Sequence, residues 1–128
     1  MNSAAENPSP IAGMRVLLVE DEMVLAMSFA DLLALSSCHV VKAVSVAHAL
    51  RCIAGGGFDG ALLDVNLGTE DIYPVADELV RRGIPLIFVT GYNRRTLRAD
   101  LRERPLVHKP FLLEELEQVM AETFVRAT

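Results

Sequence analysis

Acidic side chains follow the ends of two apolar runs in this sequence of 128 residues. Glu20, Asp21 and Glu22 follow the run "RVLLV", and Asp64 follows "ALL", so a carboxylate ends what reads as a buried strand. A buried carboxylate without a partner is costly, so such a group shifts its pKa, pairs with a cation or binds a metal. An aspartate beside a divalent ion can also attack phosphorus and form an aspartyl phosphate.

Two further polar side chains end later apolar runs. Thr90 ends "PLIFVT" and Lys109 ends "PLVHK". A set of oxygen ligands without Cys or paired His suits Mg²⁺, and a hydroxyl and an ammonium would neutralise the oxygens of a transferred phosphoryl group. Taken singly, each residue has a structural explanation: acids in a first helical turn, a strand-end hydroxyl, a lysine before a proline. Their conjunction indicates a phosphoryl-transfer site.

Five short runs with β character must position these residues. They lie at 15–20, 39–44, 60–65, 85–90 and 105–109. The first, third and fourth runs are almost continuously apolar, as expected of parallel strands that are covered on both faces. Helix-length segments separate the runs, so the pattern predicts an α/β sheet with helices on both sides. The carboxyl ends of such strands meet at one rim, where ligands bind.

The helical segments show apolar periodicity. One stripe in 23–36 contains Leu25, Phe29, Leu32 and Leu33, and one in 111–125 contains Leu113, Leu116, Val119, Met120 and Phe124. Ser45 is expected to cap the second helix, which Gly55, Gly56 and Gly57 end, and Gly83 is expected to end the third. Residues 94–103 have few apolar positions and many charges, which predicts a short or mobile helix.

Composition excludes several classes of protein. Seventeen acidic and twelve basic residues give a net charge of −5, the wrong sign for binding nucleic acid phosphates. No apolar run is long enough to span a bilayer, and the start of the chain has no signal-peptide pattern, which favours a cytoplasmic protein. Residues 1–13 are polar with two prolines and read as a flexible leader before one domain at 14–125, with no effector domain after it. Cys38 and Cys52 read as free thiols.

Four segments in order, "VLLVEDE", "ALLDVNL", "FVTGY" and "LVHKPF", resemble the receiver domain of bacterial two-component response regulators. The resemblance covers about residues 14–125. It implies a flavodoxin-like, doubly wound sheet of five parallel strands in the order 2-1-3-4-5. It also implies that Asp64 accepts a phosphoryl group from a sensor histidine kinase or a histidine phosphotransfer protein, and that the domain then switches its binding to a downstream protein partner.

The resemblance assigns further roles by position. It places the Mg²⁺ ligands at Glu20 (mainly through water), Asp21, Asp64 and the backbone carbonyl of Asn66. The switch hydroxyl falls on Thr90 and the lysine of the motif on Lys109, followed by Pro110 in a cis peptide. Such a protein is a signalling phosphoacceptor rather than an enzyme, and we expect a monomer or a weak dimer.

The sequence departs from the usual receiver pattern in two places. Leu106 stands where most receivers carry an aromatic residue, so an aromatic flip coupled to the threonine cannot be the switch here. We expect Leu106 to pack against the domain, on a face that a partner also contacts. The loop after Asp64 lacks the Pro-Gly-Asp pattern of DNA-binding regulators. Together with "FVTGY", these departures resemble a subgroup of stand-alone receivers. Tyr92 either shields the phosphoryl group or packs in its loop.

Two other functions remain open from the residues. One is an interaction module with the same fold that works without phosphorylation. The other is an aspartyl-phosphate hydrolase, which needs a second aspartate two residues after the nucleophile, where Asn66 stands. A nucleotide-binding domain is disfavoured because neither GxxxxGK[ST] nor GxGxxG occurs.

Overall fold

The computed structural model describes residues 9–65 and 70–125. Its strands are β1 (Arg15–Val19), β2 (His39–Ala43), β3 (Gly60–Asp64), β4 (Leu86–Thr90) and β5 (Leu106–His108). Its α-helices are α2 (Met23–Ala34), α3 (Val46–Gly55), α4 (Tyr73–Arg82) and α5 (Leu113–Met120). Two 3₁₀ turns, η1 (Arg94–Thr96) and η2 (Ala99–Leu101), precede β5, and a π-helical turn, η3 (Ala121–Val125), follows α5.

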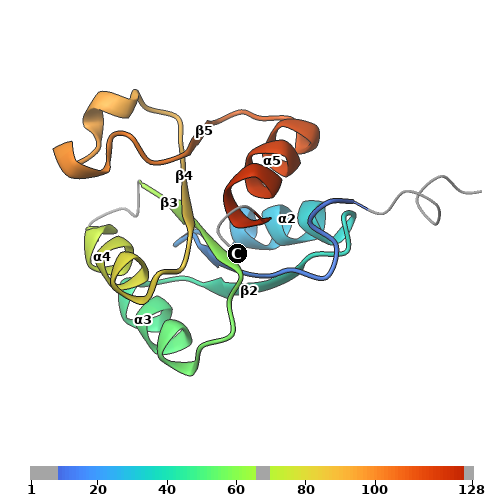
Figure 1. Ribbon diagram of the computed structural model, residues 1–128, viewed down its shortest axis with the longest axis horizontal. Coiled ribbons are helices and arrows are strands. Elements are labelled where there is room, and N and C mark those ends of the chain that lie inside the picture. Colours follow the sequence, from blue (N-terminus) through green and yellow to red (C-terminus); the bar gives the residue numbers. More distant parts are fainter. Residues whose placement is uncertain (1–8, 66–69, 126–128) are drawn as a thin grey trace, which may run out of the picture.

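The five strands form one parallel sheet in the order β2-β1-β3-β4-β5, which confirms the predicted α/β fold. Helices α3 and α4 cover one face and α2 and α5 the other (Figure 1). Side chains of β1 alternate between the two cores: Leu17 and Val19 pack with α3 and α4, whereas Val16 and Leu18 pack with α2 and α5. Both faces of the sheet are therefore buried, as the continuous apolar runs predicted.

The predicted helix ends are confirmed at α3 and α4. The Ser45 hydroxyl accepts the backbone N–H of His48 at 3.1 Å, and Gly56, with φ +74°, follows the end of α3. Gly83 caps α4 in the left-handed region at φ +71°, where a residue with a Cβ would be strained. The weak helix expected over 94–103 is instead the two 3₁₀ turns, because only Leu97 and Leu101 of that segment are buried.

The expectation of a flexible leader over residues 1–13 is wrong for residues 9–13; residues 1–8 lie outside the described part. Ile11 is fully buried in the core under α2 and α5. The Ser9 hydroxyl donates to Glu117 Oε2 at 2.6 Å, and Ser36 donates to the same oxygen at 2.7 Å. The leader is thus tied to α5 and to the end of α2 before β1 begins.

The buried residues of helix α2 differ from the predicted apolar stripe. Its fully buried residues are Ala26 and Leu33, while Leu25 is 46% exposed. Met23 and Met27 are 56% and 49% exposed. Among the described residues, no helix is long and apolar enough to cross a membrane.

Candidate functional site

The predicted site residues meet at the carboxyl ends of four adjacent strands. Glu20 follows β1, Asp64 ends β3, Thr90 ends β4 and Lys109 follows β5. The parallel register pairs Asp64 with Val89 on the next strand, so consecutive strands end level with one another. The sheet therefore brings together side chains that are up to 89 positions apart in the sequence.

Lys109 reaches over the two buried carboxylates. Its Nζ lies 3.5 Å from Asp64 Oδ1 and 3.9 Å from Glu20 Oε1. Glu20 is 3% exposed and Asp64 is 7% exposed. The single ammonium charge lies beside two carboxylates in a poorly hydrated place, so the lysine alone cannot neutralise both of them when both are ionised.

Three carboxylates form a cluster that suits a divalent cation. One oxygen from each of Glu20, Asp21 and Asp64 lies within 4.8 Å of the other two. Within residues 9–65 and 70–125, Glu20 Oε2 is buried without a hydrogen-bond partner. Burial, a hydrogen bond with Asp64 and the charge of Asp64 raise the pKa of Glu20 to about 8, against a smaller opposing effect of Lys109. An unpartnered oxygen in an all-carboxylate set fits Mg²⁺. Asn66, the fourth expected ligand, lies outside the described residues.

A hollow of about 290 Å³ opens over the carboxylates, next to the end of β4 that carries Thr90. The hollow is lined by Glu20, Asp21, Glu22, Leu25, Asp64, Gly91, Tyr92 and Lys109. Thr90 itself is 1% exposed, and its Oγ1 accepts the backbone N–H of Tyr92 at 3.0 Å. The Tyr92 ring is 55% exposed at the rim. The Lys109–Pro110 peptide bond is cis, as expected.

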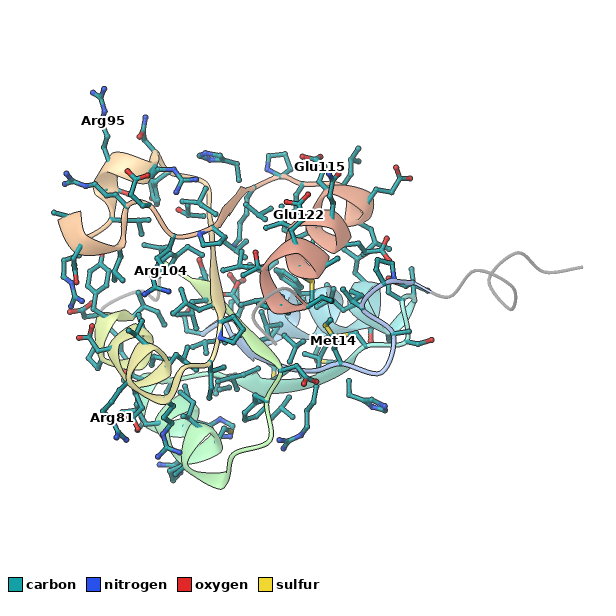
Figure 2. All side chains as sticks on the ribbon, viewed as in Figure 1. Met14, Arg81, Arg95, Arg104, Glu115 and Glu122 are labelled. Carbon is teal, nitrogen blue, oxygen red and sulfur yellow. The ribbon has the colours of Figure 1, made fainter. Side chains whose placement is uncertain are left out.

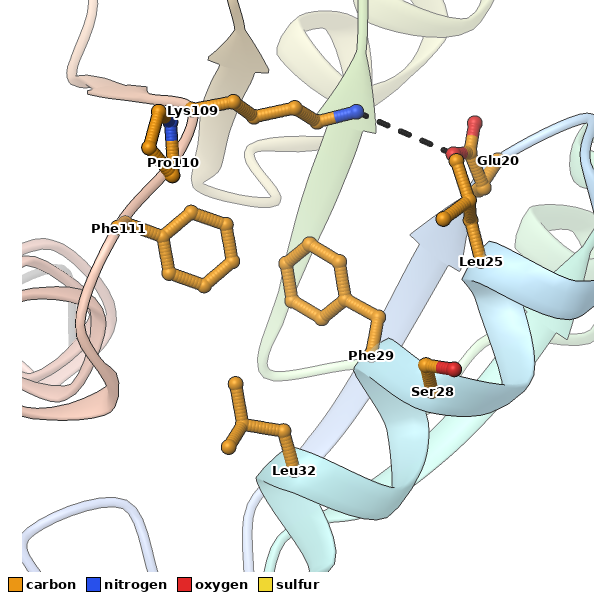
Figure 3. A pocket seen from close by; sticks show the side chains of 8 residues that line it. All are labelled: Glu20, Leu25, Ser28, Phe29, Leu32, Lys109, Pro110 and Phe111. Atoms are coloured by element: carbon orange, nitrogen blue, oxygen red, sulfur yellow. Dashed lines mark ion pairs between the residues drawn. The ribbon is translucent and has the colours of Figure 1, made fainter.

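A second hollow, of about 330 Å³, adjoins the first between α2 and the segment after β5 (Figure 3). Leu25, Phe29 and Leu32 face Phe111 and Pro110 across it, and Glu20 and Lys109 close one end. The rings of Phe29 and Phe111 lie 5.2 Å apart between centroids. Sequence reasoning assigned the α2 residues to the core and missed this groove, because helical periodicity does not tell a core face from an open one.

Leu106 lies half-buried on the edge strand. It pairs in register with Phe88 and packs against the core that α3 and α4 form. The packing confirms the first part of our expectation for this residue, and the structure does not test its contact with a partner.

The sequence and the fold both match known receivers. The profile of the response regulator receiver domain matches residues 16–121. The transcriptional regulatory protein TcrA of Mycobacterium tuberculosis is 31% identical over 111 residues, which are 83% of this chain. The chain spans 44% of the length of TcrA.

Solved structures agree with this match. The BeF3-activated conformation of SdrG from Pseudomonas melonis Fr1 is 38% identical, with a TM-score of 0.72 over 86% of this chain and 95% of that chain. The response regulator TrrA from Thermotoga maritima, in complex with Mg²⁺-BeF, has the same fold at 22% identity, with a TM-score of 0.75 over 85% of this chain and 97% of that chain. The chain therefore belongs to the response regulator receiver domain family.

Proposed function

We propose that this chain is a phosphoacceptor: Asp64 takes a phosphoryl group from a phosphohistidine of a sensor kinase or phosphotransfer protein, and the modified domain changes its binding to a downstream protein. The observation that carries the proposal is the position of Asp64. Its carboxylate lies in an open hollow, 3.5 Å from Lys109 and within a cluster of acids that fits Mg²⁺.

The transfer needs few protein groups. An Asp64 oxygen forms a bond to phosphorus while the bond to the donor imidazole nitrogen breaks, and the imidazole leaves. Lys109 already lies beside the attacking carboxylate, so its ammonium can neutralise the phosphoryl oxygens without a large movement. Tyr92 at the rim limits the access of water to the product.

Glu20, Asp21 and Asp64 would hold the Mg²⁺, with Asn66 as the further ligand that the family resemblance implies. The bound ion supplies positive charge that draws the donor's phosphoryl oxygens and the carboxylates together. These residues meet its needs because the cluster offers oxygen atoms only, and one of them has no other partner.

Phosphorylation of Asp64 would change the hydrogen bonds of Thr90. The product carries about −1.5 to −2 charge in place of −1. The Thr90 hydroxyl, which now accepts from the Tyr92 backbone, would turn to donate to a phosphoryl oxygen. This releases the Tyr92 N–H and biases the chain that follows, through η1 and η2, toward a second arrangement. In this scheme the packing of Leu106 changes together with that segment, and no aromatic side chain has to flip.

The test uses acetyl phosphate as a small donor and intact mass as the readout. We expect one phosphoryl group per chain with Mg²⁺, little without Mg²⁺, and none in Asp64→Asn. Asp31→Asn, which removes an exposed carboxylate from α2, is the matched control and should be modified normally.

Each alternative function predicts a different result in this experiment. Continuous release of phosphate over many turnovers would identify a hydrolase, and no modification by any donor would identify a module that works unphosphorylated. Normal modification of Asp64→Asn would place the acceptor elsewhere.

A further inference from the structure

Segment 93–104, which contains η1 and η2, is basic in an acidic chain. It holds five of the twelve basic residues and only two of the seventeen acidic ones. We call its five arginines the arginine surface: Arg94, Arg95, Arg98, Arg102 and Arg104. Figure 2 shows Arg95 pointing away from the body, apart from Glu115 on α5 and Glu122 in η3. Basic residues are therefore concentrated in this segment.

Four of these arginines lack a carboxylate partner. Within residues 9–65 and 70–125, Arg98 alone of the five forms ion pairs, with Asp77 at 2.5 Å and Asp100 at 2.6 Å. The other four form no ion pair with a carboxylate of these residues, although the hydrogen bond from Arg98 and, to a smaller extent, the charge of Arg104 lower the pKa of Asp100.

Backbone carbonyls hold two of the unpaired guanidinium groups in place. Arg94 Nη1 donates to the carbonyl oxygens of Arg102 at 2.7 Å and Arg104 at 2.6 Å. Arg102 Nε donates to the carbonyl of Leu97 at 3.0 Å. A carbonyl orients a guanidinium without cancelling its charge. These side chains lose less entropy than free ones when they bind, and arginine binds carboxylates in bidentate geometry.

A small hollow of about 200 Å³ adjoins the surface. It is lined by Val80, Gly83, Ile84, Pro85 and Arg104. Val80 is 40% exposed. The hollow can take one apolar side chain, with Arg104 beside its mouth.

We propose that the arginine surface docks an acidic segment of another protein, whose carboxylates pair with Arg94, Arg95 and Arg104 and whose apolar side chain fills the hollow beside Val80. The hollow beside Val80 favours a protein segment over a nucleic acid, because it takes an apolar side chain, which a phosphodiester backbone does not offer. The inference rests on the proposed function for its control by phosphorylation, because the segment begins three residues after Thr90.

The test titrates the full chain with labelled synthetic peptides by fluorescence anisotropy. One peptide has a leucine between glutamates, a second replaces the leucine with serine, and a third replaces the glutamates with lysines. We expect the first to bind about tenfold more tightly than the second, and the third not to bind. Arg95→Glu combined with Arg104→Glu should weaken binding at least about tenfold, whereas Arg51→Glu, which reverses one exposed charge on α3, should change it less than about twofold.

Several results would overturn the inference. One is that peptide binding does not saturate near about 1 mM, and another is that Arg51→Glu weakens binding as much as the double variant. The inference is also overturned if duplex DNA or phosphatidylglycerol vesicles bind more tightly than the peptide through Arg95 and Arg104, or if the chain self-associates through these residues. The titration is repeated with Mg²⁺ and beryllium fluoride. If the acidic peptide binds neither with nor without the mimic while Asp64 responds normally, this inference alone is refuted. If the peptide binds but Asp64 does not respond to the mimic, the proposed function alone is refuted.

Discussion

At the scale of single residues, the burial of Glu20 disfavours the ionised form of its carboxyl group. Glu20 is 3% exposed, one of its oxygens has no hydrogen-bond partner among the residues that the structure describes, and its pKa is raised from 4.5 to about 8. A group whose pKa is higher in the folded state binds more protons there than in the unfolded chain. Stability therefore falls as pH rises between the two values.

We predict that Glu20→Gln stabilises the metal-free protein, and that its advantage grows from about pH 4.5 to about pH 8. The difference should be small at the acid end, where both folded and unfolded wild type hold the proton, and on the order of a few kcal/mol at the alkaline end. Urea unfolding in chelator at a series of pH values measures it.

Glu22→Gln is the matched control, because Glu22 is an exposed acid in the same stretch and should show no such trend. Saturating Mg²⁺ should reverse the order of wild type and Glu20→Gln, since the ion needs the carboxylate. An advantage that is constant with pH would mean that Glu20 is ionised throughout and that its burial is compensated in another way.

The sequence predicts the identity of the site residues but not their electrostatics. Asp64, Thr90 and Lys109 were found because each interrupts or ends an apolar run, and the sheet does bring them together. The unpartnered Oε2 of Glu20 depends on side-chain positions that no spacing encodes.

At the scale of elements, α2 has two apolar faces. One face packs through Ala26 and Leu33, and the other leaves Met23, Val24 and Met27 about half exposed or more. Exposed apolar side chains on one helix mark a binding surface. We expect this face to receive the protein that donates the phosphoryl group.

Met27→Glu should therefore slow phosphoryl transfer from a phosphohistidine protein at least about tenfold, while the rate with acetyl phosphate stays within about twofold. Rapid-quench measurements with both donors separate docking from chemistry. Leu35→Glu is the control, since Leu35 is 76% exposed beyond the other end of α2. Equal slowing with both donors would show that Met27 supports the site itself.

Element types were predictable, and their detailed roles less so. The strands were found because continuous apolar runs need two covered faces, and helix ends because Ser45 and Gly83 have backbone preferences of their own. The predicted apolar stripe of α2 did not include Ala26, because alanine gives a weak periodic signal, although Ala26 is fully buried.

At the scale of the whole molecule, residues 9–13 close one core. Ile11 is fully buried with α2 and α5, and Ser9 shares the Glu117 carboxylate with Ser36. One isoleucine among polar residues and prolines has no periodicity, so the sequence suggested a loose leader. Only the tertiary contact reveals its role.

We predict that Ile11→Ala destabilises the domain by about 2–4 kcal/mol, through lost burial and the cavity left behind. Pro10→Ala, at the exposed neighbouring position, should cost less than about 0.5 kcal/mol. Urea unfolding of both variants measures the difference. A cost for Ile11→Ala as small as that of Pro10→Ala would show that the leader does not stabilise the domain in solution.

The central claim is that Asp64 is an acceptor whose modification is felt at the edge strand. An amide NMR titration with Mg²⁺ and then beryllium fluoride, a phosphoryl mimic, tests it most directly. We predict shifts at Asp21, Asp64, Thr90 and Lys109 that spread to Leu106 and vanish in Asp64→Asn. No shift at saturating Mg²⁺ and mimic, or the same shifts in Asp64→Asn, would contradict the account.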